Sequence, residues 1–128
     1  LCLHLQRAAR AVARRFDEAL RPVGLTNGQF SLMMSLNRPE APKLGSVAEL
    51  LALDRTTLTA NLKPLERRGL VAVTTDPDDR RSRRLSLTAA GKALLADAFP
   101  VWQETHARIE ADLPDDPDRV RTALVSLS

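Results

Sequence analysis

"SVAELLALDRTTLTANLKPLERRGLV", residues 46–71, has the pattern of two helices joined by a tight turn. Glu49 follows Ser46 by three residues, which is the spacing of a capping box, so we expect a short helix to begin at Ser46. Asp54 is a favourable N-cap for a second, longer helix, and Gly69 is a favourable residue for its C-terminal end. A short helix, a tight turn and a longer helix together indicate a helix-turn-helix.

The segment that follows alternates apolar and polar residues in two short runs. Residues 70–75 (LVAVTT) and 84–88 (RLSLT) have the two-residue period of strands, and residues 76–82 (DPDDRRS) have the composition of a turn. Leu85 and Leu87 fall on one face of the second run, which we expect to cover the core. The sequence therefore predicts a β-hairpin directly after the helix-turn-helix.

Helical patterns flank this unit on both sides. Residues 1–21 repeat apolar side chains at three- and four-residue steps, and residues 27–37 form a second, mostly apolar segment. Residues 38–45, with two prolines and a glycine, are expected to be a loop. Thr88 can cap a long helix that ends near residue 113, and a last helix is expected through residues 120–127. The predicted fold is mainly α with a small β-hairpin, a winged helix-turn-helix flanked by N- and C-terminal helices.

Composition excludes several classes of protein. A single cysteine leaves no intrachain disulfide framework and no multi-cysteine zinc site, and it favours a reducing cytoplasm. No apolar run approaches the roughly 18 residues that span a bilayer, so we expect no membrane partner. Cys2, His4 and His106 have no spacing typical of a nucleophile with its base or of a metal site, so we expect no enzyme, cofactor or metal. The chain does not begin with methionine, and we expect its natural start to lie upstream.

The longer helix of the helix-turn-helix has an exposed strip suited to a DNA groove. At 100° per residue, Leu58, Leu62 and Leu65 share the inward side. The outward side carries small hydroxyls, an alanine and long cations, which reach phosphates and base edges at close range. A solvated helix face with no partner is the alternative. The candidate DNA-binding residues of this helix are Arg55, Thr56, Thr57, Thr59, Ala60, Lys63 and Arg67.

The hairpin tip concentrates positive charge. Like charges repel, so folding gains nothing from four neighbouring arginines, and we expect an anionic partner for them, although the net charge of the chain is only +3. An arginine that enters a narrow minor groove meets an enhanced negative potential. Asp79 is expected to pair with one of the arginines and to orient it. A solvated charge run is again the alternative. The candidate DNA-binding residues of the tip are Arg80, Arg81, Arg83 and Arg84.

Taken together, these features resemble the MarR (multiple antibiotic resistance regulator) family of winged helix-turn-helix transcription regulators. The resemblance is carried by residues 46–71, by Asp79-Arg80-Arg81 followed by Leu87-Thr88 and Gly91, and by residues 19–36 (ALRPVGLTNGQFSLMMSL), and it covers nearly the whole chain. It implies an obligate homodimer that grips double-stranded DNA at a pseudo-palindromic operator, commonly as a repressor. It also implies that the longer helix reads the major groove and that Arg81 enters the minor groove. Two-fold symmetry would place the two recognition helices about 34–36 Å apart.

The residues themselves also favour self-association. A lobe of about 65 residues cannot cover the apolar side chains of the terminal helices, among them Trp102, Ile109 and Leu124. We expect a single domain over residues 1–128. Its expected parts are a DNA-binding lobe over about 26–91 and dimerisation helices over about 1–24 and 92–128.

The resemblance further implies a response to a small aromatic or phenolic effector, bound in a crevice between the dimerisation helices and the lobe. The possible lining residues are His4, Arg7, Phe30, Met33 and Met34. Methionine side chains adapt to varied ligands, but the alternative is that these two only fill the core.

Cys2 is a possible redox sensor. Its interval from the second helix matches the organic-hydroperoxide-sensing branch of the family, but that branch activates its cysteine with tyrosine hydroxyls, and this chain has no Tyr. The alternative is an inert buried thiol. A different class of function is a winged-helix module that binds acidic protein surfaces and no DNA. Steeply salt-dependent binding to duplex DNA would separate the two classes, because phosphate contacts release counterions.

Overall fold

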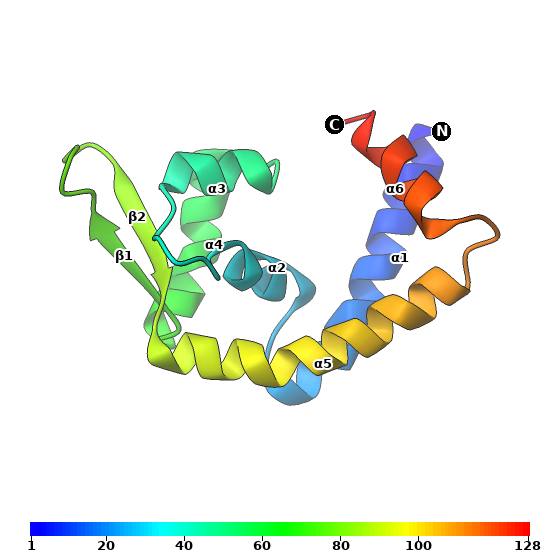
Figure 1. Cartoon of the computed structure of the whole chain (residues 1–128), viewed down its shortest axis with the longest axis horizontal. Coiled ribbons are helices and arrows are strands. Elements are labelled where there is room, and N and C mark those ends of the chain that lie inside the picture. Colours follow the sequence, from blue (N-terminus) through cyan, green and yellow to red (C-terminus); the bar gives the residue numbers. More distant parts are fainter.

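One long helix, α5, joins a lobe that carries the hairpin to an arm formed by the two ends of the chain (Figure 1). The computed structural model describes residues 1–128. In chain order the elements are α1 (Cys2–Leu20), the 3-10 turn η1 (Arg21–Val23), α2 (Asn27–Ser35), α3 (Leu44–Leu50), α4 (Arg55–Arg67), β1 (Val71–Thr75), β2 (Arg83–Leu87), α5 (Ala89–Ala111) and α6 (Pro117–Val125). The predicted mainly α fold with one small hairpin is confirmed.

Three predicted helix ends are confirmed and one is wrong. Gly69 follows the end of α4 with a left-handed φ of 70°, as expected of a C-terminal glycine. Asp54 caps α4 by accepting a hydrogen bond from the backbone N–H of Thr57, and Thr88 caps α5 by accepting one from Gly91. The predicted capping box at Ser46 is wrong, because α3 already begins at Leu44 and has no side-chain cap. The residues before α3 are held by the sheet, and this earlier anchor sets where the helix starts.

That anchor is an isolated β-bridge between β2 and the predicted loop over residues 38–45. The backbone N–H of Leu85 in β2 donates to the carbonyl of Pro42 at 2.9 Å, and Lys43 forms a bridge with Arg84. On the other edge, β2 pairs antiparallel with β1, with Val71 opposite Leu87. The two prolines of the loop argued against sheet pairing here, because proline is rare in sheets except at edges.

The core is continuous from the lobe into the arm. Leu58, Leu62 and Leu65 of α4 are buried as predicted, and so are Leu85 and Leu87 of the hairpin. Buried residues of α1 and α5 belong to the same cluster, namely Phe16, Leu20, Leu95 and Ala98.

Trp102, the single tryptophan, lies where α1, α2 and α5 meet. All three phenylalanines of the chain stack on its ring, with centroid distances of 6.3 Å to Phe16, 5.7 Å to Phe30 and 5.9 Å to Phe99. Stacked aromatic rings bury large apolar areas, so this cluster fixes the arm against the lobe. None of the helices combines the length and apolar character needed to cross a membrane.

The start of α5 is locked to the end of α4. The Thr88 hydroxyl donates to the Gly69 carbonyl at 2.6 Å, and its backbone N–H donates to the Leu70 carbonyl at 3.1 Å. A Cβ atom at Gly91 would lie only 2.0 Å from the Leu70 carbonyl oxygen. A glycine is therefore required at residue 91, because the backbone of α5 passes directly against that carbonyl.

Candidate nucleic-acid interface

The outward strip of α4 is available for contact. Its inward leucines are buried, whereas all seven candidate residues are exposed, namely Arg55, Thr56, Thr57, Thr59, Ala60, Lys63 and Arg67. The prediction of an exposed strip is confirmed. Because the strip has no apolar side chain larger than alanine, a polar, closely approaching partner such as a DNA groove fits it better than a protein core does.

The N-terminal end of α4 carries a fixed negative charge. The Thr57 N–H donates to the Asp54 carboxylate at 2.7 Å, and this backbone hydrogen bond holds the pKa of Asp54 below its ordinary value. An anionic cap stabilises the first turn of a helix. The cap thus orders the first turn, from which Arg55 and Thr56 project.

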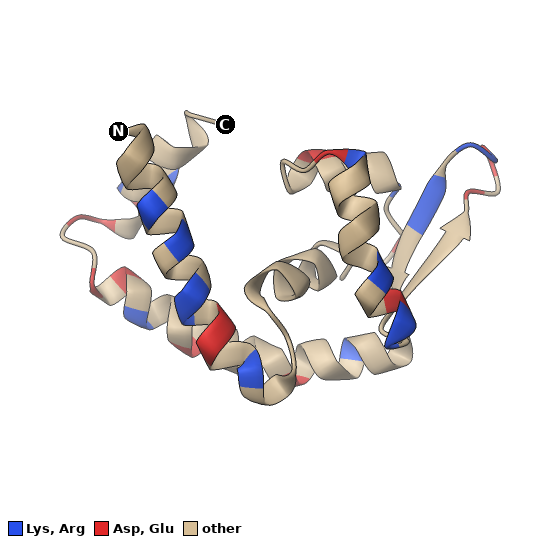
Figure 2. Ribbon diagram, turned by 180° about the vertical axis from the view of Figure 1, so that it is seen from behind, with Lys and Arg blue, Asp and Glu red and all other residues tan.

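The tip of the wing projects beyond the rest of the lobe and carries a cluster of basic residues (Figure 2). Arg80, Arg81 and Arg83 are exposed there, as predicted. The prediction that Asp79 pairs with an arginine side chain is not supported. Its carboxylate instead accepts from the backbone N–H of Arg81 at 3.0 Å and from the hydroxyl of Ser82 at 3.3 Å. Asp79 therefore shapes the tight turn that presents Arg81, since a short acidic side chain satisfies backbone N–H groups two residues on.

The predicted contact of Arg84 with DNA is not supported. The structure directs the Arg84 side chain toward the base of the wing. The guanidinium donates to the Ala41 carbonyl at 2.8 Å, and its Nε lies 3.4 Å from the carboxylate of Asp76. These bonds occupy the guanidinium within the fold, so Arg84 holds the hairpin to the loop before α3. Alternation along β2 predicted an outward direction but gave no sign of the buried acid beside it.

Asp76 is the structural residue that the sequence did not reveal. It is fully buried, its Oδ1 accepts from the backbone N–H of Asp78 at 3.1 Å, and its Oδ2 lies 3.6 Å from the Nζ of Lys43. The Asp78 N–H lowers the pKa of Asp76 most, and the charges of Arg84 and Lys43 lower it further against the opposing effect of burial. From sequence, Asp76 with Pro77 is simply a turn-initiating pair.

The fold and these motifs coincide with a known family. The family model described as the MarR family matches residues 25–82, which run from just before α2 through the tip of the wing. The M. tuberculosis transcriptional regulator MosR, solved in complex with DNA, is 38% identical with a TM-score of 0.91, over 99% of this chain and 92% of that one.

The chain belongs to the MarR family.

The chain is also similar to two other transcription regulators. The transcriptional repressor CouR, solved bound to a 23-mer DNA duplex, is 35% identical with a TM-score of 0.81, over 99% of this chain and 88% of that one. The transcriptional activatory protein BadR of Rhodopseudomonas palustris is 33% identical over 95 residues, 72% of this chain and 54% of BadR. The matched region spans 62% of the first curated relative and 54% of BadR, which is less than two thirds of either protein.

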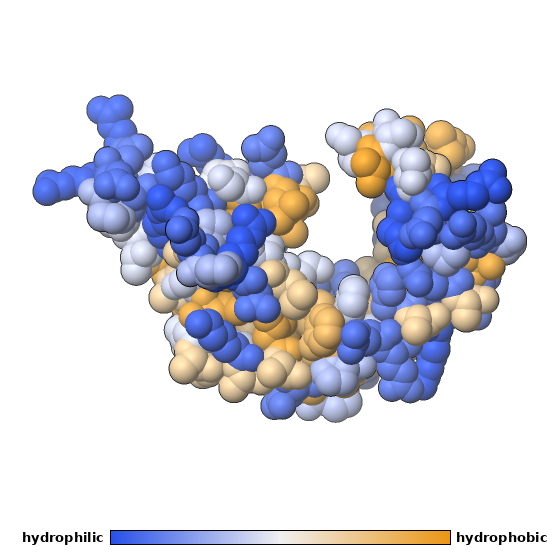
Figure 3. All heavy atoms as spheres, viewed as in Figure 1, coloured by the Kyte–Doolittle hydropathy of each residue, from blue (hydrophilic) through white to orange (hydrophobic).

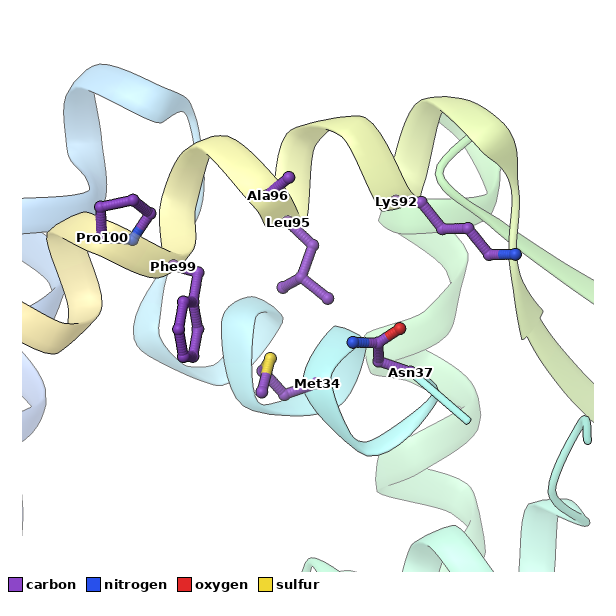
Figure 4. Close-up of a pocket in the computed structure, with 7 residues that line it drawn as sticks. All are labelled: Met34, Asn37, Lys92, Leu95, Ala96, Phe99 and Pro100. Carbon is purple, nitrogen blue, oxygen red and sulfur yellow. The ribbon is translucent and has the colours of Figure 1, made fainter. Parts of the chain in front are cut away.

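The residues predicted for an effector crevice do not come together. Phe30 and Met33 are buried in the core, which confirms the alternative for Met33, while His4 and Arg7 lie exposed on α1. Of these residues, Met34 lines a cavity of about 470 Å³ between α2 and α5. Figure 4 shows Phe99 and Leu95 of α5 pointing toward Met34 of α2, with Asn37 and Lys92 at the other end.

The alternative of a buried Cys2 is wrong for the single chain. Its thiol is exposed at the start of α1, and the polar group near it is the amide of Gln6, 3.5 Å from the sulfur. The neutral Gln6 amide brings no positive charge to the sulfur, as a neighbouring Lys, Arg or protonated His would. The structure thus adds no support to a redox role.

Proposed function

We propose that this chain is a sequence-specific DNA-binding transcriptional regulator that acts as a homodimer on a pseudo-palindromic operator. The observation that carries the proposal is the pairing, on one lobe, of the exposed strip of α4 with a wing that projects free arginines. In this arrangement α4 enters the major groove and the wing enters the neighbouring minor groove. MosR and CouR, which share the fold over nearly their whole length, are both seen bound to DNA.

Within α4, we assign sequence readout to the residues nearest the centre of the strip. Thr56 and Lys63 lie about two turns apart on the strip and reach base edges and phosphates, while the small side chain of Ala60 between them permits close approach. In the wing, we assign the minor groove to Arg81, because the Asp79 turn fixes its backbone and leaves its guanidinium free. Arg80, Arg83 and Arg67 supply further positive charge toward phosphates.

The arm carries the surface that we assign to dimerisation. The two ends of the chain lie together at its tip, and exposed apolar side chains gather there (Figures 1 and 3). Leu1 and Val125 are 83% and 71% exposed, and Leu3, Leu124 and Leu127 are exposed beside them. A second copy that covers these side chains would remove them from water. We therefore assign residues of about 1–24 and 92–128 to the dimer contact and residues of about 26–91 to DNA binding.

We assign the effector site to the cavity between α2 and α5 rather than to the residues chosen from sequence. Its apolar part, with Phe99 and Met34, suits an aromatic ring, and Lys92 and Asn37 offer a cation and an amide at the polar end. A small aromatic carboxylate or phenolate has both features. Binding there would change the angle between α5 and the lobe, and hence the spacing of the two recognition helices in the dimer.

The proposed regulator acts in the cytoplasm as a repressor and has no catalytic step. CouR, a repressor, is similar over most of its length, whereas BadR, an activatory protein, is matched over 54% of its own. A repressor that occupies its operator blocks the polymerase without any bound cofactor. Transcription from a promoter that contains the operator should fall when the protein is added and recover when effector is added.

Titration of fluorescent duplex with the purified chain at several salt concentrations tests DNA binding. We expect the logarithm of affinity to fall linearly with the logarithm of salt concentration, because each neutralised phosphate releases counterions. A module that binds only acidic protein surfaces would show no duplex binding under the same conditions.

A further inference from the structure

A polar cleft of about 360 Å³ lies between the first turn of α3, the start of α4 and the wing. Four cationic side chains line it, against one carboxylate, that of Glu49, so the lining has a net charge of +3 (four minus one). The four cations are Lys43, Arg55, Arg81 and Arg83. Cations gathered in one cleft repel one another, so the arrangement favours an anion between them.

Arg55 is seated in this cleft by a glycine. A Cβ atom at Gly45 would lie 2.9 Å from a terminal guanidinium nitrogen of Arg55 and 3.6 Å from its Cζ. The guanidinium therefore lies directly over the backbone of Gly45, in space that any other residue would take. Gly45 has no unusual backbone angle to explain it, since the positive φ angles of glycine occur only at residues 24 and 69. The missing side chain of Gly45 instead makes room for the Arg55 guanidinium.

The wing side of the cleft is ordered by its own hydrogen bonds. The backbone of Arg81 is fixed by Asp79, and the Arg83 guanidinium lies 3.3 Å from the Arg80 carbonyl and 3.4 Å from the Thr75 hydroxyl. Neither Arg55 nor Arg81 has a carboxylate within 4.0 Å of its guanidinium. Both charges are thus left without an acidic partner.

We propose that this cleft is a phosphate-binding site, in which Arg55 on the α4 wall and Arg83 on the wing hold one phosphate group, while Arg81 at the edge of the cleft is left for the minor groove. The planar guanidinium matches phosphate oxygens in pairs, which a lysine does not. The cleft has room for roughly a dozen waters at about 30 Å³ each, enough for a phosphate with part of its hydration shell.

The phosphate has two possible sources, and one of them rests on the proposed function. A backbone phosphate of the operator would bridge α4 and the wing and so fix the position of the reading helix relative to the minor-groove arginine. A phosphorylated small molecule would occupy the same site, and its charge would exclude the DNA backbone. In both cases the Arg55 guanidinium must lie over the backbone of Gly45.

Gly45→Ala tests the site without removing a charge, because the new methyl group displaces only the far end of the Arg55 side chain. Gly28→Ala is the matched control, since it adds a methyl group to another helical glycine that has no atom within 4 Å of the new Cβ position. Arg55→Gln removes the charge itself. Duplex binding of the full chain, measured across salt concentrations, should weaken about five-fold in Gly45→Ala and stay unchanged in Gly28→Ala. In Arg55→Gln the salt slope should fall by about 0.9.

Two further arms distinguish the sources. If a DNA phosphate occupies the cleft, replacement of that phosphate by one neutral methylphosphonate should weaken duplex binding by the wild type about five-fold. The same replacement should not weaken duplex binding by Arg55→Gln. If a small phosphorylated ligand occupies the cleft, inorganic pyrophosphate should bind the wild type and Gly28→Ala in calorimetry but not Gly45→Ala. No single methylphosphonate in the duplex should then change the affinities of the wild type and Arg55→Gln differently.

The site is overturned if Gly45→Ala and Arg55→Gln keep both the wild-type duplex affinity and salt slope and the wild-type response to pyrophosphate. If the wild type nevertheless binds duplex DNA normally, the phosphate site is lost but the proposed function stands. Conversely, if the wild type binds no duplex but binds pyrophosphate in a manner that Gly45→Ala abolishes, the phosphate site stands and the proposed function falls.

Discussion

The Asp76 carboxylate lies 3.4 Å from the Nε of Arg84, and it is fully buried at the base of the wing. This pair joins the end of β1 to β2, and Lys43, the residue before α3, reaches the same carboxylate. A buried acid between two cations balances charges that would otherwise repel each other inside the fold. The direction of the wing therefore depends on a residue that cannot touch DNA.

Asp76→Asn should lower the denaturation midpoint and weaken duplex binding several-fold, because Arg84 and Lys43 lose their shared counter-charge. The pKa of Asp76 is held below its ordinary value of 3.8 in the folded chain. Its contribution to stability is therefore complete above that value and is lost as the pH falls through the lower folded pKa. Urea denaturation between pH 2 and pH 7 should show a smaller loss on acidification in Asp76→Asn than in the wild type. Asp78→Asn, an exposed neighbour, is the control and should behave as the wild type.

Gly91→Ala should destabilise the fold by about 3 kcal/mol, the upper end of the usual cost of overpacking. The reason is that the new Cβ atom would overlap the Leu70 carbonyl oxygen, a backbone atom that cannot rotate away. Chemical denaturation gives the free energy of unfolding directly. Gly28→Ala, with open space around the new methyl group, should cost nothing, and equal stability of the two variants would show that the contact at residue 91 relaxes freely.

Arg81→Ala should weaken operator binding more than ten-fold while the dimer stays folded. The side chain is exposed and makes no bond within the chain, so its loss removes a DNA contact and leaves the hairpin intact. Fluorescence anisotropy at fixed salt measures the affinity, and circular dichroism with sedimentation checks fold and assembly. Unchanged affinity would remove Arg81 from the interface.

Lys63→Ala and Thr56→Ala should both weaken binding, by an amount that depends on the operator sequence. Residues that contact base edges discriminate between bases, at about 1–3 kcal/mol for a good pair, whereas phosphate contacts do not. Affinities for a set of single-base operator variants test this. If both variants lose the same factor on every operator, α4 does not read the sequence.

Periodicity and capping predicted most of the fold. The inward leucines of α4, the Asp54 cap and the alternation of Leu85 with Leu87 each depend on neighbours in the chain, and all three are confirmed. The outward strip of α4 followed from the same helical period. Local patterns were sufficient because these elements bury one face against a single core.

Contacts between distant segments could not be predicted in this way. Arg84 turns inward because Asp76 and the carbonyl of Ala41 meet it there, and no local pattern encodes that meeting. The true start of α3 likewise depends on the hydrogen bond that the Pro42 carbonyl accepts from the distant Leu85 N–H. The cavity residues Lys92 and Phe99 belong to a helix expected to serve dimerisation, so no local pattern pairs them with Met34.

Selection of bound sequences from a random duplex pool is the decisive measurement for the proposed regulator. A dimer with one α4 in each of two successive major grooves should enrich an inverted repeat whose half-sites are centred about 10–10.5 base pairs apart, or a multiple of that distance. Recovery of no common sequence, or of a single unpaired half-site, would contradict a symmetric dimer that reads an operator with α4 and the wing.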